Sequence, residues 1–95
     1  MNMTREEAIS CVGPGWAELV GEIYDKLPPD AHILQIKEKF GGLRFYVDSN
    51  TELLDFIDDM EAKSLTICEK CGKPGKPRRG GWIITLCDEC HKSRF

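Results

Sequence analysis

The sequence predicts an α+β fold in which amphipathic helices pack on a β-hairpin and a four-cysteine element follows at the C-terminus. Apolar residues recur at helical spacing in residues 16–27 and 49–64, and a glycine pair interrupts an alternating segment in residues 32–48. Two Cys-x-x-Cys pairs near the end of the chain predict the C-terminal element. Because 95 residues are near the lower limit for independent folding, we expect one domain, with a body over 1–66 and a cysteine segment over 67–95.

Three segments of the body predict helices. Thr4 and Glu7 have the spacing of a capping box, which predicts a short helix toward Cys11. Residues 16–27 carry one apolar face, and Pro28-Pro29 end the pattern. In residues 49–64 the expected inner face carries Leu53, Phe56, Ile57 and Met60, and the expected outer face carries Asp55, Asp58, Asp59 and Glu61.

Residues 32–48 predict a β-hairpin, because Gly41-Gly42 suits a two-residue turn with positive φ angles. In that register Phe40 faces Leu43 across the turn. The expected inner face is Ile36, Phe40, Leu43, Phe45 and Val47, and the expected outer face is Lys37, Lys39, Arg44 and Tyr46. Glu38 falls on the apolar face, where a carboxylate needs a partner or a place near the sheet edge.

The cysteine segment has the pattern Cys-x2-Cys-x15-Cys-x2-Cys, formed by Cys68, Cys71, Cys87 and Cys90. This spacing matches four-thiolate zinc sites, because each two-residue gap lets a tight turn direct two sulfurs at one ion. Four thiolates close a tetrahedral sphere, whereas catalytic zinc keeps one position open for water. We therefore expect structural Zn²⁺ in a zinc-ribbon-like element. His91, beside Cys90, is a possible substitute ligand.

Other cysteine chemistries stay open but fit the pattern less well. Disulfides need an oxidising compartment, and five cysteines leave one unpaired. A thioredoxin-like pair belongs on a βαβ scaffold, and iron–sulfur clusters usually have other spacings. Cys11 is far from the pairs in sequence, and we expect it to be a small buried apolar residue. The chain has no evident acid–base or nucleophile pair, so the prediction is a protein that is not an enzyme, with a metal-dependent enzyme as a remote alternative.

The N-terminal sequence MNMTREEAIS lacks the basic and apolar regions of a secretory signal. No stretch approaches the ~18 apolar residues of a membrane span. We therefore expect a cytoplasmic protein without membrane contact, in a compartment where thiols stay reduced.

Charge is divided unevenly along the chain. Residues 1–62 contain five basic and thirteen acidic residues, whereas residues 63–95 contain eight basic and three acidic ones. The basic loop 70–82 could contact phosphates and stack a base on Trp82. Alternatively, its cations balance the negative charge of a metal–thiolate centre, and Trp82 begins a buried strand that runs to Leu86. The candidate contacts of this loop are Lys73, Lys76, Arg78, Arg79 and Trp82.

Three motifs resemble a group of small bacterial and phage proteins without an established activity. The motifs are GPGW at Gly13–Trp16, QIKEKFGGLRFYVD at Gln35–Asp48 and CEKCGKPGKPRRGGWIITLCDEC at Cys68–Cys90. The group has a Gly-Trp helix start, a Lys-Glu-Lys-Phe-Gly-x-Leu-Arg-Phe-Tyr hairpin and a Cys-x-x-Cys-Gly … Leu-Cys-Asp module. The resemblance covers most of the chain from Gly13 onward, and it implies a bacterial or phage origin and a zinc knuckle.

Together these patterns predict a small non-enzymatic zinc-binding protein that acts by binding another protein, as a regulator or inhibitor of a host system. The expected contact surfaces are the acidic face of residues 49–64 and the hairpin face of Lys37, Lys39, Arg44 and Tyr46. The alternative is a nucleic-acid-binding zinc ribbon that uses the basic loop 70–82.

Overall fold

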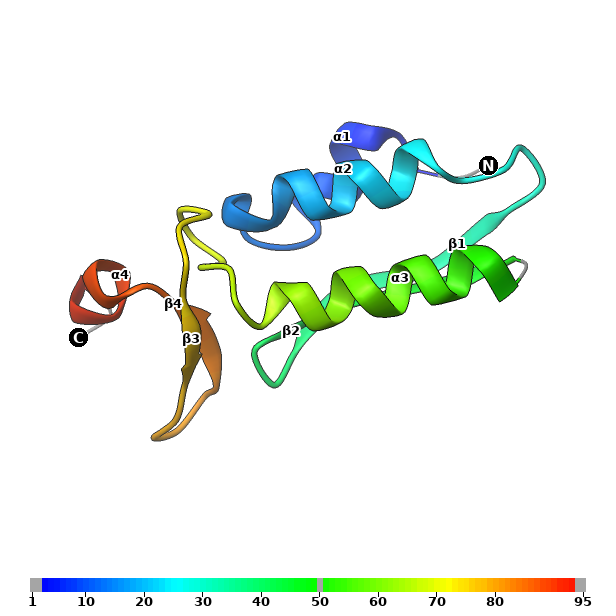
Figure 1. The fold of residues 1–95 in the computed structure, drawn as a ribbon. Coiled ribbons are helices and arrows are strands. Elements are labelled where there is room, and N and C mark those ends of the chain that lie inside the picture. The colour runs from blue at the N-terminus through cyan, green and yellow to red at the C-terminus, as the bar shows by residue number, and fades with distance from the viewer. Residues whose placement is uncertain (1–2, 50, 94–95) are drawn as a thin grey trace.

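The computed structural model describes residues 3–49 and 51–93, and it confirms the predicted α+β fold (Figure 1). The helices of the body precede and follow a β-hairpin, and a second, smaller hairpin with a terminal helix holds the cysteines. The elements are α1 (Arg5–Ser10), a 3-10 turn η1 (Pro14–Trp16), α2 (Ala17–Asp25), β1 (His32–Lys39), β2 (Gly42–Asp48), α3 (Thr51–Ser64), β3 (Lys76–Arg78), β4 (Ile84–Leu86) and α4 (Asp88–Ser93).

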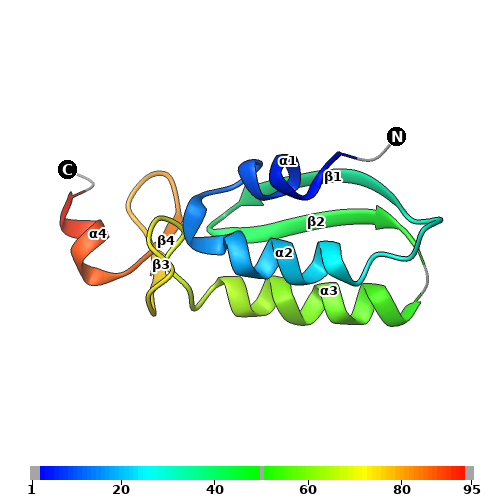
Figure 2. The same cartoon turned by 90° about the horizontal axis from the view of Figure 1, so that it is seen from above.

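The body has two layers and the cysteine segment extends from one end of it. Helices α2 and α3 lie side by side against the β1–β2 hairpin, and β3, β4 and α4 continue beyond the hairpin turn (Figures 1 and 2). The molecule is accordingly elongated, at 43 × 23 × 21 Å. Within residues 3–49 and 51–93, no helix combines the length and apolarity needed to cross a membrane.

The body core joins the predicted apolar faces of α2 and α3 to one face of the hairpin. Trp16 is fully buried at the start of α2, and its indole Nε1–H donates to the Ile67 carbonyl at 2.9 Å. This bond attaches the cysteine segment to the body core. The buried members of the core are Ala8, Trp16, Leu19, Val20, Ile23, Ile36, Leu43, Phe45, Val47, Leu53, Ile57 and Met60.

Helix α1 begins at the predicted cap but places Cys11 differently from the prediction. The Thr4 hydroxyl accepts from the Glu7 N–H at 3.1 Å, and the Glu7 carboxylate accepts from the Thr4 N–H at 2.8 Å. Ala8 is the buried residue of this helix. Cys11, at the C-terminal end, is exposed, so the expectation of a buried Cys11 is wrong. Ile9, the other apolar residue of the helix, is partly buried and packs against the core.

The hairpin turn lies one residue earlier than predicted. Phe40 and Gly41 both have positive φ, +54° and +83°, and Lys39 pairs with Gly42. Leu43 therefore faces Glu38, and Phe45 faces Ile36. The pairing moves by two positions relative to the predicted register, which keeps each side chain on its predicted face. Phe40, now within the turn, is the exception: it leaves the inner face and is 68% exposed.

Glu38 is half-buried near the turn, and its Oε1 accepts from the Gly41 N–H at 3.4 Å. Helix α3 supplies polar partners to the outer edge of strand β2. The outward-pointing N–H groups on Leu43 and Phe45 donate to Ser64 Oγ and Glu61 Oε2, both at 2.9 Å. Glu61 was predicted to face solvent, but it is half-buried because it satisfies this strand edge.

The two hairpins meet at Gly41. Thr85 of β4 is fully buried, and its hydroxyl donates to the Gly41 carbonyl at 2.6 Å. A Cβ atom at Gly41 would lie 3.1 Å from Ile83 Cγ2 and 3.2 Å from Thr85 Oγ1, and the φ of +83° disfavours any side chain there, so both the contact and the turn favour glycine. The position of the cysteine segment on the body therefore depends on this turn.

Replacing Phe40 with Asn is expected to stabilise the protein. Asn tolerates the left-handed region and Asn-Gly is a favoured type I′ turn, whereas a bulky residue there costs on the order of 1 kcal/mol. Loss of the aromatic contacts of Phe40 offsets part of this gain. The free energy of unfolding, measured in denaturant, should therefore rise by about 0.5–1 kcal/mol. A Phe40→Val control should be less stable than wild type, and a less stable Phe40→Asn variant would contradict the assigned turn.

Replacing Thr85 with Val is expected to lower the free energy of unfolding by about 1–3 kcal/mol, because the Gly41 carbonyl loses its buried donor. Thr66→Val is the matched control, since the exposed Thr66 hydroxyl also donates to a carbonyl, that of Lys63 at 2.7 Å. The control should change stability by no more than about 0.5 kcal/mol. Equal losses in the two variants would show that the junction is not coupled to folding.

Candidate metal centre

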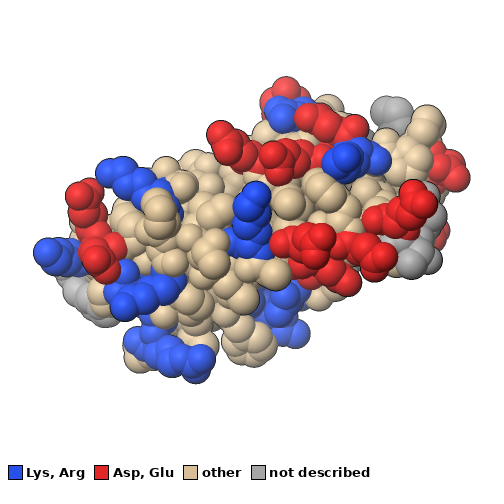
Figure 3. Space-filling model, viewed as in Figure 1, with Lys and Arg blue, Asp and Glu red and all other residues tan. Residues whose placement is uncertain are grey.

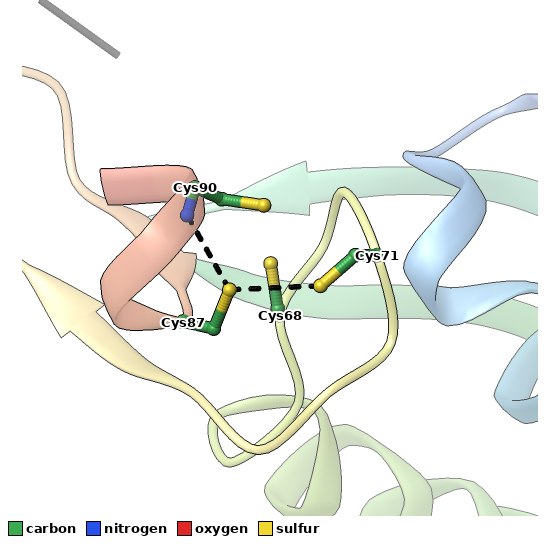
Figure 4. Close-up of side chains that lie close together, drawn as sticks. All are labelled: Cys68, Cys71, Cys87 and Cys90. Atoms are coloured by element: carbon green, nitrogen blue, oxygen red, sulfur yellow. Dashed lines mark hydrogen bonds between the residues drawn. The ribbon is translucent and has the colours of Figure 1, made fainter. Parts of the chain in front are cut away.

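The sulfurs of Cys68, Cys71, Cys87 and Cys90 converge on one point and all lie within 4.8 Å of one another (Figure 4). Those of Cys71 and Cys87 are 3.6 Å apart. A regular tetrahedron with metal–sulfur bonds of about 2.3 Å has sulfur–sulfur edges of about 3.8 Å. The four cysteines are therefore placed to bind a metal such as zinc.

Two turns present the four sulfurs. In the first, the Cys68 N–H donates to the Lys73 carbonyl at 2.8 Å and the Gly72 N–H donates to the Cys68 carbonyl at 2.9 Å. In the second, Cys87 follows β4 and Cys90 lies in the first turn of α4, where its N–H donates to Cys87 Sγ at 3.4 Å. Each pair is thus oriented by its own backbone, as the two-residue spacing predicts.

Backbone contacts lock the first turn against the body and against the second hairpin. The Glu69 N–H donates to the Thr85 carbonyl at 2.9 Å, and the Gly15 N–H donates to the Glu69 carbonyl at 2.7 Å. A Cβ atom at Gly15 would overlap the Cys68 carbonyl oxygen, so the approach of these backbones requires glycine there. The GPGW segment therefore begins a helix and also contacts the backbone of the first cysteine turn.

Arg78 and Asp88 fix the second hairpin to α4. The Arg78 guanidinium donates through Nε to the Leu86 carbonyl at 3.2 Å and through Nη2 to Asp88 Oδ1 at 2.7 Å. These contacts hold the pKa of the Asp88 carboxyl below its usual value. The Arg78 side chain is only 11% exposed, so its contacts within the chain leave little of it for a partner.

The local electrostatics favour a bound cation. Burial by itself raises the pKa of the Cys68 thiol, but backbone N–H groups of Cys87, Cys71 and Lys70 outweigh it and lower the pKa to about 6. Contacts with the sulfurs of Cys87 and Cys68 raise the pKa of the Cys90 thiol to about 12. A second negative charge beside a thiolate is unfavourable, so the four groups can all ionise only with a cation among them.

The donor set fits a metal ion better than the other cysteine chemistries. All five cysteines are free thiols, and the four in the cluster offer soft ligands in a closed arrangement. Among the described residues, this cluster is the group of potential ligands close enough to share one ion, and neither Cys11 nor His91 belongs to it. The backbone N–H of His91 donates to the Cys87 carbonyl at 2.9 Å.

The structure separates the other predicted contact residues into three groups. On the second hairpin, Lys73 forms an ion pair with Glu89 at 3.7 Å, while Lys76 and Arg79 are exposed. Trp82 precedes β4 and is 73% exposed, so its expected place in a buried strand is wrong. The third group shares the outer face of the β1–β2 hairpin: Lys37 and Arg44, which are half-buried, and Lys39 and Tyr46, which are exposed.

On the face shown in Figure 3, acidic and basic side chains predominate at different ends of the molecule. In Figure 3, Asp and Glu predominate over α1, α2 and α3, whereas Lys and Arg predominate around β3, β4 and the adjoining end of the body. This division matches the charge asymmetry of the sequence, and the cysteine cluster lies at the basic end.

Phe40 is the surface residue that the sequence interpretation missed. The hairpin turn and the loop before β4 enclose a groove of about 300 Å³, lined by Glu38, Lys39, Phe40, Gly81, Trp82 and Ile83. The groove brings together Lys39 of the predicted hairpin surface and Trp82 of the basic loop 70–82. No local sequence signal places Phe40 in the turn, because Gly41-Gly42 is the favoured two-residue turn pair in this segment.

No protein-family model, curated protein or solved structure matches this chain.

Replacing Cys87 with Ser is expected to weaken metal binding by more than about 100-fold. Mutating a residue that only hydrogen-bonds to a metal ligand already lowers metal affinity by about 10–100-fold, and loss of a ligand should cost more. Cys11→Ser, the control from outside the cluster, should bind as the wild type does. Titration with Co²⁺ measures both, since tetrahedral thiolate coordination gives intense visible and near-ultraviolet absorption. Equal Co²⁺ affinities of the two variants would show that Cys87 is not a metal ligand.

Proposed function

We propose that this chain is a small, non-enzymatic zinc-binding protein and that Zn²⁺ has a structural role in it. The convergence of four sulfurs within 4.8 Å carries the proposal. Four cysteine ligands are the usual donor set of structural zinc, and they fill its tetrahedral sphere. Cys68, Cys71, Cys87 and Cys90 would hold the ion, which offsets part of their negative charge and joins the two turns.

Zinc would act as a folding partner for the C-terminal third. The apolar cluster of this part is small, with Cys68, Leu86 and Cys87 buried and Ile84 and Cys90 packed against them. Zinc-finger peptides gain about 10–16 kcal/mol from their ion, which equals or exceeds the stability of most small domains. A metal centre can therefore supply the stability that so few buried side chains cannot.

The proposed activity is binding to another protein. Two large aromatic side chains, Phe40 and Trp82, are exposed beside one groove, and aromatic residues are enriched at protein interfaces. The motif resemblance places such a protein in a bacterial or phage setting, where it would regulate or inhibit a host system.

Nucleic-acid binding through loop 70–82 is the second candidate. Exposed Lys76, Arg79 and Trp82 favour it, since cations contact phosphates and an indole stacks on bases. The acidic surface over the helices opposes it, because it repels a polyanion at long range. Arg78 also contributes little, since its guanidinium is held by Asp88 and Leu86.

Protein purified under reducing conditions is expected to contain one zinc ion per chain, measured by elemental mass spectrometry. Removal of that ion by a chelator should unfold the C-terminal third, visible as lost amide dispersion for residues 67–93 in NMR spectra, and readdition of Zn²⁺ should restore it. A folded, metal-free protein that is indifferent to chelator would overturn the zinc proposal.

The same two preparations test the binding activity. Zinc-loaded protein used as bait in lysate of the source cell should retain a specific protein that chelator-treated bait does not. Capture of background alone by both baits would count against the protein-partner proposal.

A further inference from the structure

We propose that the partner supplies an extended acidic peptide segment, which adds as a third strand to the free edge of β1 and places one large apolar side chain between Phe40 and Trp82. This inference rests on the proposed protein-binding function and specifies its surface and ligand.

The first support is that the two edges of the hairpin differ in how their outward N–H groups are hydrogen-bonded. The outward N–H groups of β2, on Leu43 and Phe45, are satisfied by α3. The register pairs these residues with Glu38 and Ile36, whose N–H groups therefore point outward on the opposite edge. In the part of the chain that the structure describes, neither of these two N–H groups has a hydrogen-bond partner.

The free edge is long enough to pair with a peptide. Strand β1 extends from His32 to Lys39 on the side of the hairpin away from α2 and α3 (Figure 2). An irregularity between Ile33 and Gln35 interrupts the ladder, but the pairing is regular from Gln35 to Lys39. Unpaired N–H and C=O groups along such a stretch are a template for an added strand.

The second support is the groove at the end of this edge. Glu38 and Lys39, the last two residues of β1, line it together with Phe40 and Trp82. Its volume of about 300 Å³ lies at the lower end of the range for ligand pockets, about 300–1,000 Å³. A strand that pairs with β1 would reach the groove with its terminal residue, so one large side chain fits there.

The third support is the conformation of the two aromatic residues. Phe40 has a φ of +54°, which is costly for a bulky side chain, yet its ring is 68% exposed and adds little to the core. Trp82 is 73% exposed and follows Gly80-Gly81, both at positive φ. Strain that holds an aromatic ring at the surface indicates a binding role more than a folding role.

Charge indicates an acidic ligand. Lys37 and Lys39 share the outer face of β1, and Arg44 lies opposite Lys37. None of the three takes part in the ion pairs found among residues 3–49 and 51–93. Acidic residues at alternate positions of an added strand would lie beside these cations, which stabilises cross-strand pairing.

A peptide matches this surface better than a nucleic acid does. The unpaired N–H groups of Ile36 and Glu38 need carbonyl partners at strand spacing, which a peptide backbone supplies. Glu38 also lines the groove, where its negative charge would repel a phosphate but not the apolar side chain that the peptide would place there.

The test is selection of a random twelve-residue peptide library on zinc-loaded protein, followed by affinity measurement for the enriched peptides. Enriched sequences should combine alternating acidic residues with one aromatic or large aliphatic residue. Phe40→Asn, which should not lose stability, and the charge reversal Lys37→Glu/Lys39→Glu should each weaken binding about tenfold or more. Leu54→Ala is the control, because Leu54 is a 40% exposed aliphatic residue on α3.

Amide hydrogen exchange distinguishes strand addition from other modes of peptide binding. Bound peptide should slow amide exchange at Ile36 and Glu38, the two outward positions of β1. Failure to enrich peptides, affinities that are equal in wild type and Phe40→Asn, or unchanged exchange at both amides would overturn the proposal.

Two further outcomes separate this inference from the functions considered above. If Phe40→Asn still captures the same partner from lysate as wild type, protein binding stands and this surface is wrong. If a labelled thymidine oligonucleotide binds, weakens steeply with salt and is displaced by no enriched peptide, the groove belongs to a nucleic-acid site instead.

Discussion

The convergence of four sulfurs on one point is the constraint on which the C-terminal third depends. Its cysteines come from two turns that are far apart in sequence, and the segment between them carries exposed glycine, lysine and arginine residues. Few apolar groups hold these turns together, so hydrophobic burial alone does not fix their spacing. A bound ion would convert this weak cluster into a rigid unit, because one set of bonds fixes both turns at once.

Several contacts join that unit to the body, and three of them use a backbone group. The Trp16 indole binds the Ile67 carbonyl, Gly15 packs on the Cys68 carbonyl, and the Thr85 hydroxyl binds the Gly41 carbonyl. The Trp16 and Thr85 side chains are fully buried, so these contacts hold the cysteine segment in a fixed position relative to the hairpin turn. The groove lies at this junction, and its shape therefore depends on the order of the metal centre.

The sequence predicted the features that depend on local spacing. Helices α2 and α3, the cap at Thr4 and each Cys-x-x-Cys turn follow from residues that lie close together in sequence. The hairpin was predicted with the wrong turn because both Phe40-Gly41 and Gly41-Gly42 can form a two-residue turn. Moving the pairing by two positions leaves the buried face unchanged, so hydrophobic alternation does not distinguish the two registers.

The errors at Phe40, Trp82 and Glu61 have a common cause. Each residue has its final environment set by an element that is distant in sequence: the second hairpin for Phe40, the first hairpin for Trp82, and β2 for Glu61. Composition gives Phe and Trp a high probability of burial, and it gives Glu a high probability of exposure. All three depart from that tendency at the places where a strand edge is satisfied or a groove is formed. Glu61 departs because it serves the fold, whereas the exposed Phe40 and Trp82 are the departures that support the proposed binding role, because folding alone would favour their burial.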